Sequence, residues 1–189
     1  MDNNKGTGLY TLSVLTEDKA GLLNHITIIF TRRKINIDSL NVSSTEVPGV
    51  SRFTIVTQTS REIIDKVVKQ IRKLIDVLDA FVYEDHQIHY QEIALYKVPI
   101  EFFINGNKIE SLVRNNGALI LVIEEDYMVI EKTGHKRETQ DLFNKLEPYG
   151  VLEFVRSGRV AISMSKRKTT TLIQQCEEST ANKLSIDSH

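Results

Sequence analysis

The sequence predicts an α+β protein made of two domains, each with the element order βαββαβ. Stretches of alternating apolar and polar residues, typical of half-buried strands, are separated by stretches with apolar residues at helical spacing. The same order of elements occurs in residues 9–86 and again in residues 90–165. The two halves show no obvious sequence similarity, but the shared order predicts two ferredoxin-like domains.

The elements of the first domain follow from its apolar spacing. Residues 9–15 alternate apolar and polar side chains, as a half-buried strand does. Asp18 is placed to cap the next helix, in which Leu22, Ile26 and Ile29 recur at helical spacing. The basic residues 32–34 close that helix, since positive charge is favourable at a helix C-terminus. Further strands are expected at 35–45, 51–59 and 75–83, and a second amphipathic helix at 63–71.

The second domain repeats this order with weaker signals. Strands are expected at 92–100, 118–124, 127–132 and 151–156, and helices at 108–114 and 139–146. A short polar connection at residues 86–90 marks the boundary between the domains. Residues 1–8 are expected to form a flexible start, and residues 166–189 a loosely ordered polar tail.

Composition excludes several classes of protein. A formal net charge of −1 over 189 residues gives no general attraction to nucleic acid or to an anionic membrane. The chain shows neither a signal peptide nor an apolar run of about 20 residues. The single Cys176 excludes an intrachain disulfide and fits a reducing compartment. We therefore expect a cytoplasmic protein without nucleic-acid or membrane partners.

The most informative segment is residues 16–23, Thr-Glu-Asp-Lys-Ala-Gly-Leu-Leu, where a strand ends and a helix begins. A helix N-terminus offers backbone N–H groups and a partial positive charge, which suit a small carboxylate. Gly21 lets a ligand come close, and Asp18 and Asn36 supply polar groups for an ammonium. These features suggest a receptor for a free amino acid. Alternatively, Gly21 is a packing glycine and Asn36 satisfies a turn that begins a strand.

No other segment indicates catalysis or metal binding. His86 and His89 are expected to face opposite ways near a strand end, which disfavours a metal site. The basic residues at 32–34 and 166–168 are expected to be solvated, and Cys176 has no nearby histidine. The sequence contains no Gly-x-Gly-x-x-Gly motif, Walker loop or nucleophile elbow. The chain is therefore not expected to be a catalyst.

Two segments of the first domain carry a resemblance to a known family. Residues 12–23 (Leu-Ser-Val-Leu-Thr-Glu-Asp-Lys-Ala-Gly-Leu-Leu) and 30–42, which include Asn-Ile-Asp-Ser-Leu, resemble the regulatory (small) subunit of acetolactate synthase. Residues 51–55, 70–78, 92–98 and 155–161 extend the resemblance over most of residues 9–165. Many amino-acid-binding ACT domains share the Asp/Asn-x-x-Gly loop, whereas Asn-Ile-Asp-Ser-Leu and Arg-Ser-Gly are more particular to this family.

The resemblance implies an N-terminal ACT domain that dimerises and binds valine or a related amino acid between subunits. The implied effector residues are Asp18, Ala20, Gly21, Leu22 and Leu23 of one subunit and Asn36 and Ile37 of the other, with Val42 and Leu23 meeting the branched side chain. Asp18 stands where the family often has asparagine. Its carboxylate suits the ammonium but repels the ligand carboxylate if it points toward it.

The resemblance also implies a separate catalytic subunit, which condenses two pyruvates to acetolactate with loss of carbon dioxide. That subunit uses thiamine diphosphate, magnesium and flavin, and this chain has no motif that would bind them. We therefore expect a regulatory partner without cofactors of its own. The alternative is an ACT-type sensor that controls a different enzyme or a transcription factor.

Overall fold

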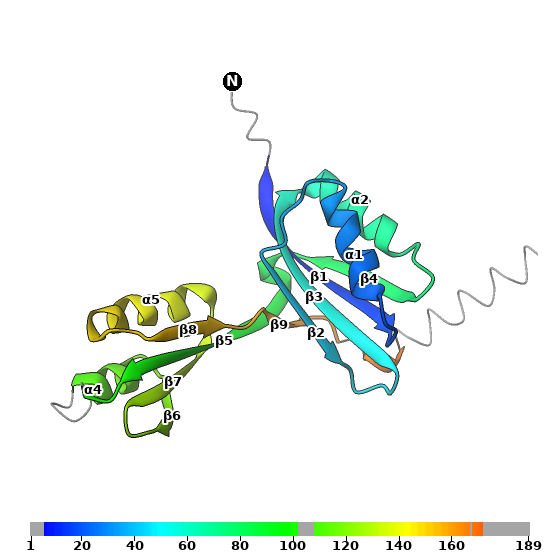
Figure 1. Ribbon diagram of the computed structural model, residues 1–189. Coiled ribbons are helices and arrows are strands. Elements are labelled where there is room, and N and C mark those ends of the chain that lie inside the picture. The colour runs from blue at the N-terminus through cyan, green and yellow to red at the C-terminus, as the bar shows by residue number, and fades with distance from the viewer. Residues whose placement is uncertain (1–5, 102–107, 167, 172–189) are drawn as a thin grey trace, which may run out of the picture. The chain divides into compact units, whose positions relative to one another are not determined.

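The computed structural model describes residues 6–101, 108–166 and 168–171. The chain divides into two units, Met1–His89 with Ala161–His189, and Tyr90–Val160 (Figure 1). Residues 161–165, which the sequence places in the second domain, are thus counted with the first unit. Cys176, the first residues of the expected flexible start and most of the expected polar tail lie outside the described residues.

The first unit is a four-stranded antiparallel sheet with two helices on one face. Its elements are β1 (Thr7–Glu17), α1 (Leu22–Thr31), β2 (Ser39–Ser44), β3 (Val50–Ser60), α2 (Arg61–Ile71) and β4 (Val77–Tyr83). The strands lie in the order β2-β3-β1-β4, so β2 and β4 form the two ends of the sheet. This is the predicted βαββαβ arrangement.

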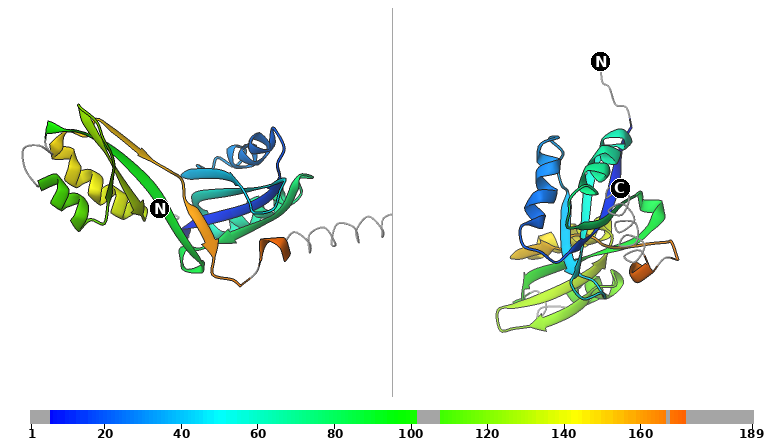
Figure 2. Two further views of the ribbon diagram at one scale, coloured as in Figure 1. Left: turned by 90° about the horizontal axis from the view of Figure 1, so that it is seen from below. Right: turned by 90° about the vertical axis from the view of Figure 1, so that its right-hand side faces the viewer.

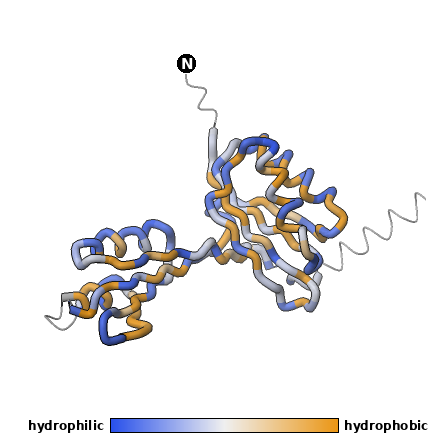
Figure 3. The backbone as a smooth tube through the Cα atoms, in the orientation of Figure 1, coloured by the Kyte–Doolittle hydropathy of each residue, from blue (hydrophilic) through white to orange (hydrophobic). Residues whose placement is uncertain are grey.

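Alternation along β1 separates the two faces of this sheet. Leu12 and Val14 belong to the fully buried core beneath α1 and α2, together with Ile26 and Ile64 from the helices. Figure 3 shows apolar residues, coloured orange, in both the helices and the strands of this unit. Leu15 has the opposite orientation, yet it is also buried. The face of the sheet away from the helices is therefore covered as well.

The second unit has a sheet of the same kind. Its elements are β5 (Ile88–Pro99), α4 (Lys108–Asn115), β6 (Leu119–Ile123), β7 (Tyr127–Gly134), α5 (Lys136–Leu146) and β8 (Glu153–Arg156), with a short 3-10 helix at Glu147–Tyr149 (η2). The 3-10 helix η1 (Asp85–Gln87) and most of β9 (Val160–Ser163) are counted with the first unit. The strand order is β6-β7-β5-β8, and β9 also pairs with β5.

Tyr96 on β5 anchors the core of the second unit. Its ring is completely buried and stacks on Phe154 of β8, with 5.2 Å between ring centroids. The Tyr96 hydroxyl donates a hydrogen bond of 2.6 Å to the carbonyl oxygen of Thr139 in α5. Burial raises the pKa of Tyr96 to about 12, because the phenolate would lose its hydration. One polar contact thus fixes α5 on the sheet.

The prediction of an α+β fold with two βαββαβ domains is confirmed, while several element boundaries differ. Helix α1 begins at Leu22 with Gly21 as its N-cap residue, so the prediction that Asp18 caps this helix is wrong. Strand β2 begins at Ser39 rather than at residue 35. The sequence analysis did not expect β9, a strand of four residues.

Candidate functional site

The loop between β1 and α1 is shaped by Gly21. Its φ of 87° lies in the left-handed region, which side chains disfavour. A methyl group built on Gly21 would meet nothing within 4 Å, so the glycine serves the turn and not close packing. The interpretation of Gly21 as a packing glycine is therefore wrong. The space beside the start of α1 is open.

Asp18 is held against the neighbouring strand. Its backbone N–H donates to the carbonyl oxygen of Gly49 at 2.9 Å, and its Oδ1 accepts a hydrogen bond from the Ser51 hydroxyl at 3.3 Å. The carboxylate remains exposed. Asp18 is thus fixed to the start of β3, which explains why it does not cap α1.

The start of α1 keeps its first amide groups available. Among the described residues no side chain caps this helix, and its first turn contains no acidic residue. The carbonyl oxygen of Gly21 accepts from the N–H groups of Asn24 and His25, which begin the helical pattern. The amides of Gly21, Leu22 and Leu23 precede that pattern, at the helix N-terminus beside the open space at Gly21.

The side chains of the loop have different environments. Leu22 is buried in the core, so it can offer only its backbone to a ligand. Leu23 is 45% exposed on α1, and Ala20 is exposed in the loop. Lys19 bridges Glu17 and Asp76 at 2.6 and 2.7 Å, and these carboxylates raise the pKa of Lys19. Lys19 therefore offsets the charges of Glu17 and Asp76 beside the loop.

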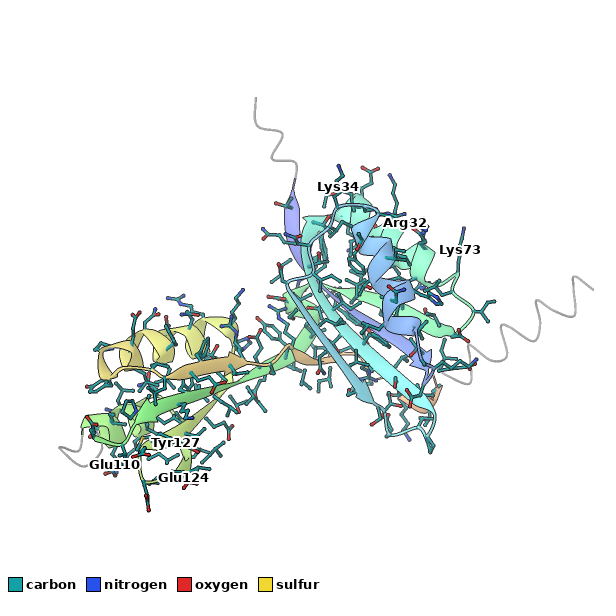
Figure 4. All side chains as sticks on the ribbon, viewed as in Figure 1. Arg32, Lys34, Lys73, Glu110, Glu124 and Tyr127 are labelled. Atoms are coloured by element: carbon teal, nitrogen blue, oxygen red, sulfur yellow. The ribbon has the colours of Figure 1, made fainter. Side chains whose placement is uncertain are left out.

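The second half of the expected site follows α1. The carbonyl oxygen of Asn36 accepts a hydrogen bond of 2.6 Å from the Thr57 hydroxyl, and the residue is exposed. Ile37 is half-buried against the core. Val42 lies opposite Phe53 in the pairing of β2 with β3, and it is 45% exposed. Arg32 and Lys34 are exposed beyond the C-terminal end of α1 (Figure 4).

A single chain does not bring the two halves together. Asp18 is bonded to Ser51 and Asn36 to Thr57, and these two anchors are six residues apart on β3. At about 3.3 Å per residue this corresponds to roughly 20 Å. The anchors Ser51 and Thr57 were not among the expected site residues. The sequence carries no distinct signal for them, because β3 also contains Thr54, Thr59 and Ser60.

A buried ionic cluster occupies the start of β5 in the second unit. The carboxylate of Glu92 lies 3.4 Å from Arg156 and 3.8 Å from Arg159, and Glu92 and Arg159 are at most 6% exposed. The Arg159 guanidinium stacks over the Tyr90 ring, 3.8 Å from its centroid. The Ser157 hydroxyl accepts from the backbone N–H of Ile93 at 2.9 Å. The Arg-Ser-Gly-Arg segment thus attaches to β5.

Metal ligands do not gather in any part of the chain that the structure describes. His86 lies in η1 and His89 in β5, and both are exposed. Within the same described ranges, no helix is long and apolar enough to span a membrane.

Comparison with known proteins assigns the chain to a family. Residues 12–79 match the AHAS small subunit-like ACT domain, and residues 91–165 match the family described as small subunit of acetolactate synthase. The chain belongs to the acetolactate synthase small subunit family. The family's ACT domain model therefore covers the β1–α1 loop and Asn36, while its second model covers the Glu92 cluster.

Individual members of the small subunit family match nearly their whole length. The acetolactate synthase small subunit of Mycolicibacterium smegmatis is 37% identical over 162 residues, 86% of this chain and 95% of that protein. The Bacillus subtilis small subunit is 32% identical over 172 residues, 87% of this chain and 98% of that protein. The crystal structure of the Thermotoga maritima small subunit has a TM-score of 0.76 and 28% identity, covering 84% of this chain and 99% of that one.

Proposed function

We propose that this chain is the non-catalytic regulatory subunit of an acetolactate synthase. It forms a homodimer, binds valine or a related branched-chain amino acid at the dimer interface, activates a separate catalytic subunit and makes that subunit sensitive to feedback inhibition. Matches over both domains favour this function over an ACT-type sensor of another enzyme or of a transcription factor.

The observation that carries the proposal is the uncapped start of α1 beside the open space at Gly21. The amides of Gly21, Leu22 and Leu23 suit the carboxylate of a free amino acid. The Asp18 carboxylate, exposed and held by Ser51, suits the ammonium. An amino acid needs both groups satisfied, and one loop supplies both.

Dimerisation would complete the site. Strand β2 ends the sheet, so one of its edges is available for pairing, and Leu23, Ile28 and Val42 expose apolar surface on α1 and β2. If two β2 strands pair in antiparallel fashion, the start of each strand meets the end of the other. Asn36, just before β2, then approaches the partner's loop at Asp18–Leu23. Leu23 and Val42 would contact the branched side chain.

Catalysis belongs to the partner subunit in this proposal. Thiamine diphosphate, magnesium and flavin would bind there, and this chain would contribute no reacting group. The contact between this chain and the catalytic subunit would transmit the effect of valine binding from the ACT domain to that subunit.

Co-purification with a thiamine-dependent synthase, assayed with and without valine, tests the proposal. We expect a complex that turns pyruvate into acetolactate faster than the catalytic subunit alone and that valine inhibits. The isolated chain should make no acetolactate even with all three cofactors added. Turnover by this chain alone, or the absence of any complex, would contradict a regulatory role.

A further inference from the structure

A cavity of about 140 Å³ lies in the first unit, on the sheet face opposite α1 and α2. Its base is formed by strand residues that include Ser13, Arg52, Thr54 and Tyr83, and its wall by Ala161, Ile162, Ser163, Ser165 and Thr169. Figure 2 shows this returning chain on the far side of the sheet from α1. The cavity is therefore separate from the loop at Gly21, which lies at the start of α1.

Arg52 supplies the charged group of this cavity. Its Nη2 donates a hydrogen bond of 3.2 Å to the Thr169 hydroxyl, whereas its Nε is buried and has no hydrogen-bond partner among the described residues. The Nε atom is enclosed by protein and is not open to the cavity. Arg52 nevertheless lines the cavity and supplies its positive charge, which favours a ligand with an anionic oxygen.

The charges around Arg52 limit the charge that a ligand in this cavity can carry. A hydrogen bond from its own backbone N–H, a second from the Thr169 side chain and the nearby charge of Arg52 together lower the pKa of the Glu46 carboxyl. Glu46 is therefore ionised at neutral pH and offsets part of the arginine charge. A singly charged carboxylate suits this balance better than a doubly charged phosphate.

The volume of the cavity and its lining residues narrow the choice of ligand further. An engineered apolar cavity of about 150 Å³ accommodates benzene, so the present volume suits a compound of about six non-hydrogen atoms. The lining residues include Ser13, Thr54, Tyr83 and Ser163, whose hydroxyl groups are able to donate to or accept from a small polar molecule.

We propose that this cavity is a second ligand site, for a compact monocarboxylate, with Arg52 as its anion contact. The site does not depend on the proposed effector function, since it shares no residue with the β1–α1 loop. Because residues of β9, together with Ser165 and Thr169, form one wall, an occupied site would hold these residues against the sheet.

Titration of the ¹⁵N-labelled full chain with sodium pyruvate tests the proposal by amide chemical shifts. We expect saturable shifts at Ser13, Thr54 and Ser163, while valine should shift the loop residues instead. Arg52→Gln should weaken pyruvate binding about tenfold or more by removing the charge-assisted hydrogen bond. Arg61→Gln, an exposed arginine on α2, is the matched control and should leave the affinity unchanged.

A second variant separates the loss of the anion contact from any displacement of the chain after β9 that Arg52→Gln causes. Ser13→Leu keeps Arg52 and fills the cavity, so it should abolish the pyruvate shifts. Inorganic phosphate should bind more weakly than pyruvate. Absence of saturable shifts at the cavity residues, equal affinity in Arg52→Gln, or preference for phosphate would each overturn the proposal.

Discussion

The Ser51 hydroxyl donates a hydrogen bond to the Asp18 carboxylate, with 3.3 Å between Oγ and Oδ1. This contact fixes the loop before α1 to the start of β3. Near the other end of β3, Thr57 donates to the carbonyl oxygen of Asn36 at 2.6 Å. One strand thus holds the two halves of the proposed effector site apart, which is the physical reason to expect that they meet only between two chains.

Substitution of Val42 by Lys should disrupt the homodimer. Val42 is exposed on β2, and a charge there would be desolvated if two β2 strands pair. Light scattering should give a dimer mass for the unmodified chain and a monomer mass for the variant. Ile63→Lys places the same charge on exposed α2 and should leave the dimer intact. A monomeric unmodified chain at micromolar concentration would contradict the prediction.

Replacement of Gly21 by Leu should prevent valine binding, because its side chain would occupy the open space beside the α1 amides. The left-handed φ of 87° also costs the variant about 1–2 kcal/mol of stability. Gly117→Leu, at a φ of 58° in the second unit, imposes a similar strain away from the site. Inhibition assays on the holoenzyme should show valine resistance in the first variant alone, with activation retained in both.

Asn36→Ala should weaken valine binding without changing the fold. Loss of one buried polar contact in the complex costs on the order of 1–3 kcal/mol, or roughly 5- to 150-fold in affinity. Calorimetric titration measures the effect. Asn144→Ala on α5 is the control, because it also removes an amide but lies in the second unit. Unchanged affinity in both Asn36→Ala and Gly21→Leu would place the effector elsewhere.

Glu92→Gln should destabilise the second unit. The substitution removes the carboxylate that Arg156 and Arg159 share, and Arg159 is only 4% exposed. Removing one partner of a buried ion pair typically costs about 3–5 kcal/mol. Urea denaturation should show the loss, whereas Glu153→Gln at an exposed position of β8 should change stability by less than about 0.5 kcal/mol. Equal stability of the two variants would mean that the cluster is solvated in solution.

Tyr96 should make the stability of the second unit fall as the pH rises in the alkaline range. Its pKa is raised to about 12 in the folded chain, so its contribution is complete below pH 10 and is lost as pH rises toward 12. The difference between the pKa of Tyr96 in the folded and in the unfolded chain corresponds to about 2–3 kcal/mol of unfolding free energy. Tyr96→Phe should be less stable at pH 7, because the Thr139 carbonyl loses its donor, but should lose less stability between pH 10 and 12. Tyr127→Phe, a half-buried control, should retain the alkaline loss.

The sequence by itself determined the order of elements and most of the core. Alternation placed Leu12 and Val14 on one face of β1, and helical spacing placed Ile26 beneath α1, because burial of an amphipathic face depends on local periodicity. The Asp-x-x-Gly loop and Asn36 were also recognisable, since their residue types suit a helix start and a turn.

Only the tertiary structure decided what those residues contact. The sequence predicts that Asp18 caps α1, but Ser51, 33 residues away, binds its carboxylate instead. Nothing in the sequence indicated that Glu92 would meet Arg156 and Arg159, or that Arg52 would line a cavity closed by β9 and by residues that follow it. Each of these contacts joins residues that are distant in the chain, so they depend on strand pairing and register, which local periodicity does not determine.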